Sequence, residues 1–114
     1  MSAKFNQITE LFSVAPQLEI NDVSAITGAG FKSVIINRPD HELSPLETTS
    51  SAMIAAAKEA GLVIHYQPVV ACDITQENIQ EFKQLYTDLP KPILAYCRSG
   101  MRCANLYELA QQSQ

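Results

Sequence analysis

The sequence predicts an α/β domain of three layers, in which a mostly parallel sheet is flanked by helices on both faces. Short apolar runs rich in β-branched residues alternate with segments at helical spacing. The runs lack polar alternation, which is typical of strands buried on both faces. The chain has 114 residues, is 46% apolar and shows no repeat or linker, so we expect one domain over 1–114.

The first half of the chain contains two predicted helices and two strands. Asn21 or Asp22 caps a short helix that closes at Gly28 and Gly30. A buried strand follows at 33–37 and ends at Pro39.

The next helix is predicted from a capping box. The box is Ser44-Pro45-Leu46-Glu47, with proline at the first helical position. The helix runs to about Ala60, and Gly61 takes the left-handed position after it. Residues 62–66 form the next strand.

The second half begins with a helix that Thr75 caps and that ends before Pro90. Its apolar stripe comprises Ile79, Phe82, Leu85, Tyr86 and Leu89. Residues 92–96 form a third buried strand, and the final helix runs from Met101 to about Gln111, with Leu106 and Leu109 inward. Residues 12–15 add an edge strand.

Composition excludes several classes of function. The net charge of −4 argues against a nucleic-acid partner, because such binders present a basic face. No apolar run reaches the roughly 20 residues that span a bilayer, so no membrane partner is expected. The first residues lack a signal peptide, which favours a cytoplasmic location. Three scattered cysteines form no disulfide framework and no metal pattern, so we expect free thiols, no metal and no cofactor.

Three loops are candidates for the functional site because they follow the carboxyl ends of strands, where α/β sheets bind ligands. They are residues 37–42, 70–73 and 97–102. The third reads Cys97-Arg98-Ser99-Gly100-Met101-Arg102 and leads directly into a helix. Its backbone N–H groups and the helix dipole favour an anion and lower the pKa of a thiol there.

We therefore predict Cys97 as a nucleophile and Arg102 as a catalytic residue that binds the anion. The predicted anion-binding set is Arg98, Ser99, Gly100, Met101 and, from the end of the first buried strand, Arg38. The alternative is a buried structural cysteine beside solvated arginines.

The motif Cys-Arg-Ser-Gly-x-Arg after an apolar strand resembles the active-site loop of rhodanese-like sulfurtransferases. The rest of the chain resembles a bacterial phosphatase-like domain that occurs alone or fused to beta-lactamase-like hydrolases. This second resemblance rests on 15–18, 29–40, 60–62, 66–69 and 93–100. It implies a fold like that of dual-specificity and tyrosine phosphatases, which also use a cysteine nucleophile.

Loop length separates these two chemistries. Four residues stand between Cys97 and Arg102, whereas the phosphatase motif has five and would place its arginine at Cys103. Tyr96 stands where phosphatases usually have histidine. A short loop suits a persulfide or thiosulfate better than a phosphomonoester. The first hypothesis is therefore a sulfurtransferase that forms a Cys97 persulfide.

Two other functions stay open. The alternative is a phosphatase that forms a Cys97 phosphocysteine, for which Asp73 is the candidate general acid and Asp40 the reserve. The other interpretation of Asp73 is an ordinary loop aspartate near a helix start. The third possibility is a non-catalytic module that binds a phosphorylated ligand.

The remaining cysteines could have redox roles. Cys103 could form a protective disulfide with Cys97, although inward packing beside Leu106 and Tyr107 is the simpler expectation. Cys72 could act as a resolving thiol.

Overall fold

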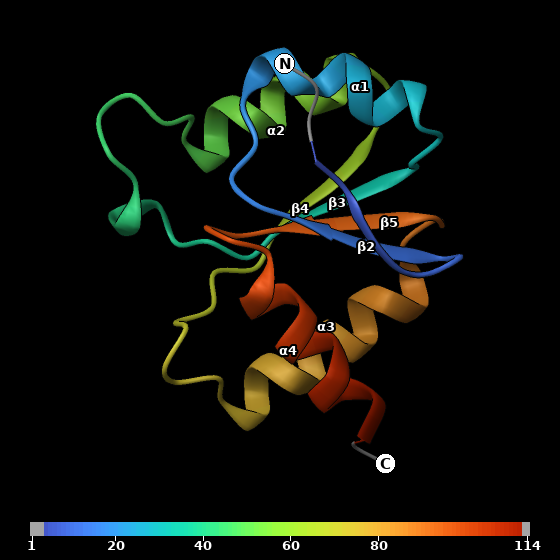
Figure 1. Cartoon of the computed structure of the whole chain (residues 1–114), viewed down its shortest axis with the longest axis vertical. Coiled ribbons are helices and arrows are strands. Elements are labelled where there is room, and N and C mark those ends of the chain that lie inside the picture. Colours follow the sequence, from blue (N-terminus) through green and yellow to red (C-terminus); the bar gives the residue numbers. More distant parts are fainter. Residues whose placement is uncertain (1–3, 113–114) are drawn as a thin grey trace.

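A five-stranded sheet lies between two pairs of helices in the computed structural model, which describes residues 4–112 (Figure 1). The elements in chain order are β1 (Asn6–Thr9), β2 (Phe12–Ala15), η1 (Ile20–Asp22), α1 (Val23–Gly28), β3 (Ser33–Ile36), η2 (Asp40–Glu42), α2 (Ser50–Glu59), β4 (Val63–Tyr66), α3 (Gln76–Asp88), β5 (Ile93–Tyr96) and α4 (Met101–Gln112).

The sheet order is β1-β2-β5-β3-β4. β2, β5, β3 and β4 run parallel, and β1 pairs antiparallel with β2. The predicted mostly parallel sheet is therefore confirmed. In the register, Tyr96 of β5 lies beside Ala15 of β2 and Ile36 of β3. The carboxyl ends of these three strands therefore lie together along one edge of the sheet. That edge is where the predicted loops emerge.

Two apolar cores confirm the three predicted layers. α1 and α2 cover one face of the sheet, and α3 and α4 cover the other (Figure 1). Alternation along the strands divides the side chains, because neighbouring residues point to opposite faces. Ala95 and Cys97 therefore face α3 and α4, whereas Leu94 and Tyr96 face α1 and α2.

The third helix follows its prediction closely. The Thr75 hydroxyl accepts from the Asn78 N–H at 3.0 Å, and the Asn78 side chain accepts from the Thr75 N–H at 2.9 Å. The predicted stripe of α3 packs into the core against α4. Capping and periodicity therefore agreed here, and the prediction was correct.

The second helix begins later than predicted, at Ser50 rather than at Pro45. The Ser44–Glu47 box closes only a turn, in which the Ser44 N–H donates to the Glu47 carboxylate at 2.9 Å. The other oxygen of Glu47 pairs with Arg38. The helix is instead capped by Thr49, whose hydroxyl accepts from the Ala52 N–H at 3.3 Å. The Asp40 carboxylate adds a second contact, accepting from the Ser50 N–H at 2.8 Å and from its hydroxyl at 2.7 Å.

Three smaller predictions were also wrong. β2 was predicted at the edge, but it lies inside the sheet because β1, which the sequence analysis did not predict, covers its outer side. β4 is instead an edge strand, and Val63 there is 45% exposed. Leu109 was predicted to point inward but is 37% exposed, whereas Leu106 is fully buried as expected.

No helix within residues 4–112 is long and apolar enough to cross a membrane. Over the same residues, no three His, Cys, Asp or Glu side chains gather into a set that could hold a metal ion.

Candidate active site

The loop that carries Cys97 connects β5 to α4 and is held against the end of β2. The Cys97 N–H donates to the Ala15 carbonyl, and the Gln17 N–H donates to the Arg98 carbonyl, each at 3.3 Å. Gly100 has a φ of +93°, and a side chain there would lie 3.3 Å from the Ala15 backbone. Glycine is therefore required both by the left-handed turn and by the close approach of the chain.

The Cys97 sulfur is buried inside this loop, where donors surround it. The Gly100 N–H donates to the sulfur at 3.1 Å. The pKa of Cys97 is lowered to about 5, chiefly because the Cys103 thiol donates to its sulfur. Burial opposes this shift, and the backbone N–H groups of Cys103, Gly100 and Ser99 reinforce it. Cys97 is therefore a thiolate at neutral pH, which is the reactive form of cysteine.

Cys103 supplies the donor from the first turns of α4. It is fully buried beside Leu106, as expected. Burial raises the pKa of the Cys103 thiol well above its usual value, and the Cys97 thiolate raises it further. Both effects favour the neutral thiol of Cys103. A protective disulfide between the two stays a prediction, and Cys72 is exposed in the loop after β4.

Arg102 connects its own loop with Glu42 of the predicted loop 37–42 and with Val69, the residue just before the predicted loop 70–73. It is 9% exposed. Its Nη1 donates to the Val69 carbonyl at 2.9 Å, and both Nη atoms bind the Glu42 carboxylate, at 3.1 and 2.9 Å. Its Nε is buried and has no hydrogen-bond partner. The Arg102 Nε–H is therefore a buried donor without an acceptor, which costs free energy unless a ligand accepts from it.

Arg38 is neither solvated nor free. It is 5% exposed, and its Nη2 donates to the Glu42 carbonyl at 2.9 Å. Its Nη1 contacts the Gln17 side chain at 3.2 Å and the Glu47 carboxylate at 3.0 Å. Arg38 therefore fixes the segment 42–47, and an anion-binding role for it stays a prediction.

The other predicted residues lie at the surface of the loops. Arg98, Ser99 and Met101 are exposed, and the Ser99 hydroxyl accepts from the Met101 N–H at 3.3 Å. Asp73 is exposed in a turn closed by its N–H and the Val70 carbonyl, at 3.0 Å. Asp40 binds Ser50 with both carboxylate oxygens, so its observed partners are structural.

The sequence analysis included Glu42 in the candidate loop 37–42 but gave it no role, and it missed the Val69 carbonyl. Glu42 also stands four residues after Arg38, a spacing that could have drawn attention to it. A backbone carbonyl has no sequence signal at all.

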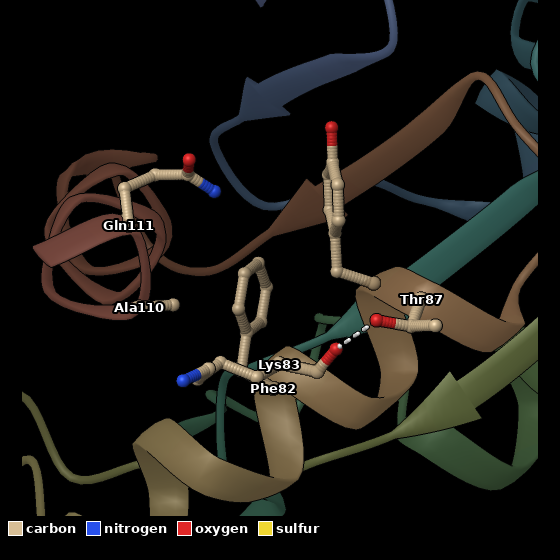
Figure 2. Close-up of a pocket in the computed structure, with 6 residues that line it drawn as sticks. Phe82, Lys83, Thr87, Ala110 and Gln111 are labelled. Carbon is tan, nitrogen blue, oxygen red and sulfur yellow. Dashed lines mark hydrogen bonds between the residues drawn. The ribbon is translucent and has the colours of Figure 1, made fainter. Parts of the chain in front are cut away.

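A pocket of about 140 Å³ lies elsewhere, between α3 and α4 (Figure 2). Figure 2 shows Phe82 and Gln111 facing it, with the Thr87 hydroxyl donating to the Lys83 carbonyl at 3.0 Å. Ala110 and Gln111 lie near the end of α4, about 12 Å along the helix from Arg102. The pocket is therefore separate from the cysteine loop.

Solved structures place the fold in a class. The chain superposes on a putative phosphatase from Neisseria meningitidis z2491 with a TM-score of 0.86 and 34% identity, over 93% of this chain and 75% of that one. It superposes on Tk-PTP with a TM-score of 0.68 and 15% identity, over 98% of this chain and 83% of that one, which shows the fold alone. The class is thus that of phosphatase-like α/β domains with a cysteine loop.

The family is narrower than this class. Residues 4–114 match the family described as "Beta-lactamase hydrolase-like protein, phosphatase-like domain", and the chain belongs to it. A curated relative, the beta-lactamase hydrolase-like protein of Xylella fastidiosa (strain Temecula1), is 32% identical over 108 residues. That match covers 95% of this chain but 25% of the relative, so the chain spans about a quarter of its length. The expected resemblance to this family is confirmed.

Proposed function

We propose that this domain is a cysteine-dependent phosphatase that hydrolyses a phosphomonoester through a Cys97 phosphocysteine. The observation that carries the proposal is the Cys97 thiolate, held by loop N–H groups beside a buried arginine in a phosphatase-like family. The comparisons support this alternative better than the sulfur transfer that the sequence analysis placed first.

The reaction would proceed in two displacements. The Cys97 sulfur attacks phosphorus, forming a P–S bond as the P–O bond to the leaving group breaks. Asp73 is the acid we assign to protonate the leaving oxygen. In the chain Asp73 comes shortly after Val69, whose carbonyl accepts from Arg102. Water then attacks the phosphocysteine, giving up a proton to Asp73. The P–S bond breaks, which releases inorganic phosphate and restores the thiolate.

The site supplies stabilisation mainly through donors that are already oriented. The loop N–H groups and Arg102 meet the negative charge of the phosphoryl oxygens without reorganising. Arg98 and Ser99, in the loop before α4, and Met101, its first residue, would surround the same anion with backbone N–H groups, the Met101 N–H exchanging the Ser99 hydroxyl for it.

One observation keeps sulfur transfer as a second candidate. The loop has four residues between Cys97 and Arg102, and a thiol rather than an arginine occupies position 103. In that reaction Cys97 attacks the outer sulfur of thiosulfate, and the S–S bond to sulfite breaks. Cyanide then removes the sulfur from the Cys97 persulfide as thiocyanate.

A side-by-side assay tests both candidates on the purified domain. An aryl phosphate is compared with thiosulfate plus cyanide, for wild type, Cys97→Ser and Arg102→Lys. We expect phosphate release that is abolished by Cys97→Ser. Arg102→Lys should reduce kcat/KM about 10²-fold, the scale of losing one oriented donor.

The mass of the trapped protein identifies the intermediate. Added phosphate on Cys97 supports the proposal. Added sulfur with thiocyanate formation, in the absence of phosphate release, would replace it with sulfur transfer. Phosphate binding without turnover, retained by Cys97→Ser and lost in Arg102→Ala, would instead establish a binding module.

A further inference from the structure

Three exposed apolar side chains lie on the segments that follow the carboxyl ends of β3, β4 and β5. Leu46 is 94% exposed, Met101 68% and Val70 48%. Each comes from a different one of these segments, which Figure 1 shows on the same side of the molecule, at the left. We refer to Leu46, Val70 and Met101 as the apolar rim.

Two residues of the apolar rim are next in the chain to the contacts of Arg102. Val70 follows Val69, whose carbonyl accepts from the Arg102 Nη1 at 2.9 Å. Met101 directly precedes Arg102 and is the first residue of α4. The backbone of both residues is therefore fixed beside the proposed anion site, while their side chains are exposed.

Leu46 is placed by the turn that Glu47 closes. The Ser44 N–H donates to the Glu47 carboxylate at 2.9 Å, and the other oxygen of Glu47 lies 3.0 Å from the Arg38 Nη1. The turn thus holds Leu46 in solvent near the end of β3. A single exposed apolar residue is ordinary on a protein surface, whereas apolar side chains from several loops at one place are typical of a binding surface.

The charges at this edge of the sheet are mostly negative. The segments that leave the carboxyl ends of the parallel strands contain five carboxylates, three arginines and no lysine; they are 16–19, 37–49, 67–75 and 97–102. Arg38 and Arg102 are buried against carboxylates, so Arg98 is the one exposed arginine of these segments. A substrate with several anionic groups would therefore meet more like charge than opposite charge.

We propose that the substrate of this site carries one oxyanion on an apolar body, with the oxyanion in the cysteine loop and the body against the apolar rim. The inference rests on the proposed function, whose anion site it uses, and names the substrate class of that site. Phosphomonoesters of aryl and alkyl groups belong to this class, whereas sugar phosphates and polyphosphates do not. Removal of the apolar rim and of the substrate body from water favours their contact.

Protection of Cys97 from alkylation measures this preference without turnover. The chain is treated with iodoacetamide, and the mass of the peptide that contains Cys97 gives its rate separately from those of Cys72 and Cys103. Methylphosphonate and phenylphosphonate, whose P–C bonds resist hydrolysis, are titrated as protecting anions. We expect phenylphosphonate to protect about tenfold more tightly, the factor that corresponds to roughly half of a phenyl ring leaving water.

The double variant Leu46→Gln/Val70→Thr removes apolar surface from the rim and keeps the loop N–H groups and the arginines. The ratio of the two protection constants should fall from about tenfold to less than about threefold. The matched control, Leu109→Gln/Val63→Thr, makes the same replacements at exposed positions of α4 and β4 outside the rim. Its ratio should stay within about twofold of wild type.

Two results of this comparison would overturn the inference. One is a ratio that the rim variant leaves at the wild-type value, and the other is an equal fall in the control. Both variants replace exposed side chains, so both should fold. The single variant Leu46→Gln provides the measurement if the double variant does not.

Benzene-1,4-diphosphonate tests the restriction to one oxyanion. It keeps the phenyl ring and adds a second anionic group on the far side of it. We expect it to protect Cys97 about threefold less well than phenylphosphonate at low salt, and the difference should shrink at high salt because salt screens the repulsion. Tighter protection by the diphosphonate would overturn the inference.

Phosphate release separates this inference from the proposed function. A preference for phenylphosphonate that depends on the apolar rim, without phosphate release from phenyl phosphate, would uphold the inference and remove the phosphatase proposal. Phosphate release from phenyl phosphate, with protection that ignores the ring, would do the reverse. If no phosphonate protects Cys97, both fall.

Discussion

At the scale of single residues, the proposed nucleophile is one of two neighbouring cysteines whose thiol pKa values are shifted in opposite directions. Cys97 lies among N–H donors and loses its proton, whereas Cys103 is fully buried and keeps its own. The pairing is directional, because a protonated thiol can donate to a thiolate but not the reverse. Under the proposed function, the residue after Arg102 thus stabilises the thiolate nucleophile without touching the substrate.

The pH dependence of Cys97 alkylation tests this division. As pH falls through about 5 the thiolate is protonated, so the rate should drop about tenfold per unit below that point and be flat from 6 to 8. Cys103→Ala removes the largest stabilising contact and should move the midpoint upward. Cys103→Ser keeps an O–H donor and should restore much of the shift. An unchanged midpoint in Cys103→Ala would show that the backbone N–H groups suffice.

At the scale of elements, the loop after β5 obtains its shape from β2. Gly100 and Gly30 share a φ of +93°, but only Gly100 lies against another segment. A methyl group at Gly30 would meet nothing within 4 Å. A comparison of Gly30 with Gly100 therefore separates the free-energy cost of the left-handed backbone conformation from the cost of the contact with Ala15.

Alanine at each glycine should measure these two costs by urea unfolding. Gly30→Ala should lower the free energy of unfolding by about 1 kcal/mol, the strain of a left-handed residue. Gly100→Ala adds the contact with Ala15 and should cost about 2 kcal/mol or more. It should also slow Cys97 alkylation, which Gly30→Ala should leave unchanged. Equal losses in both variants would mean that the Ala15 contact relaxes freely.

The elements also show how far the sequence could be interpreted. α3 was predictable because its cap and its stripe lie within the helix itself. The start of α2 was predicted too early, because the Ser44–Glu47 box forms only a turn and the helix is capped by Thr49, with Asp40 binding Ser50 from ten residues away. The motif selected Cys97 and Arg102 for the candidate site, and their roles stay predictions. The contact of Glu42 could not be predicted, since its partner lies 60 residues away in the chain.

At the scale of the whole molecule, the two cores meet across one sheet. Phe12 contributes to the core under α3 and α4. Its ring stacks on the Tyr107 ring with 4.6 Å between the ring centroids, and it meets the Phe82 ring edge-on with 5.7 Å between the centroids. Phe82 lies on α3 and Tyr107 on α4, the two helices that cover the face of the sheet against which Cys97 packs. The stability of that layer therefore depends strongly on one aromatic group.

Truncation of this side chain gives a large expected effect. Phe12 is 0% exposed, so Phe12→Ala should lower the free energy of unfolding by about 3–5 kcal/mol. Leu46 is 94% exposed, and Leu46→Ala should change it by less than about 0.5 kcal/mol. Thermal or urea unfolding of the two variants measures the contrast. A loss below 1 kcal/mol in Phe12→Ala would mean that the aromatic cluster collapses around the gap.

The strand order has a consequence for how the domain assembles. β2 and β3 never touch as a pair, because β5 lies between them. A nascent chain that ends before Ile93 holds two separate pieces of sheet, β1-β2 and β3-β4, with nothing to join them. The strand that completes the sheet also leads directly into Cys97, so the reactive thiol emerges only with the segment that closes the fold. Because the groups that lower its pKa lie at positions 99–103, this thiol acquires its reactivity only when the last strand and the start of α4 have joined the sheet.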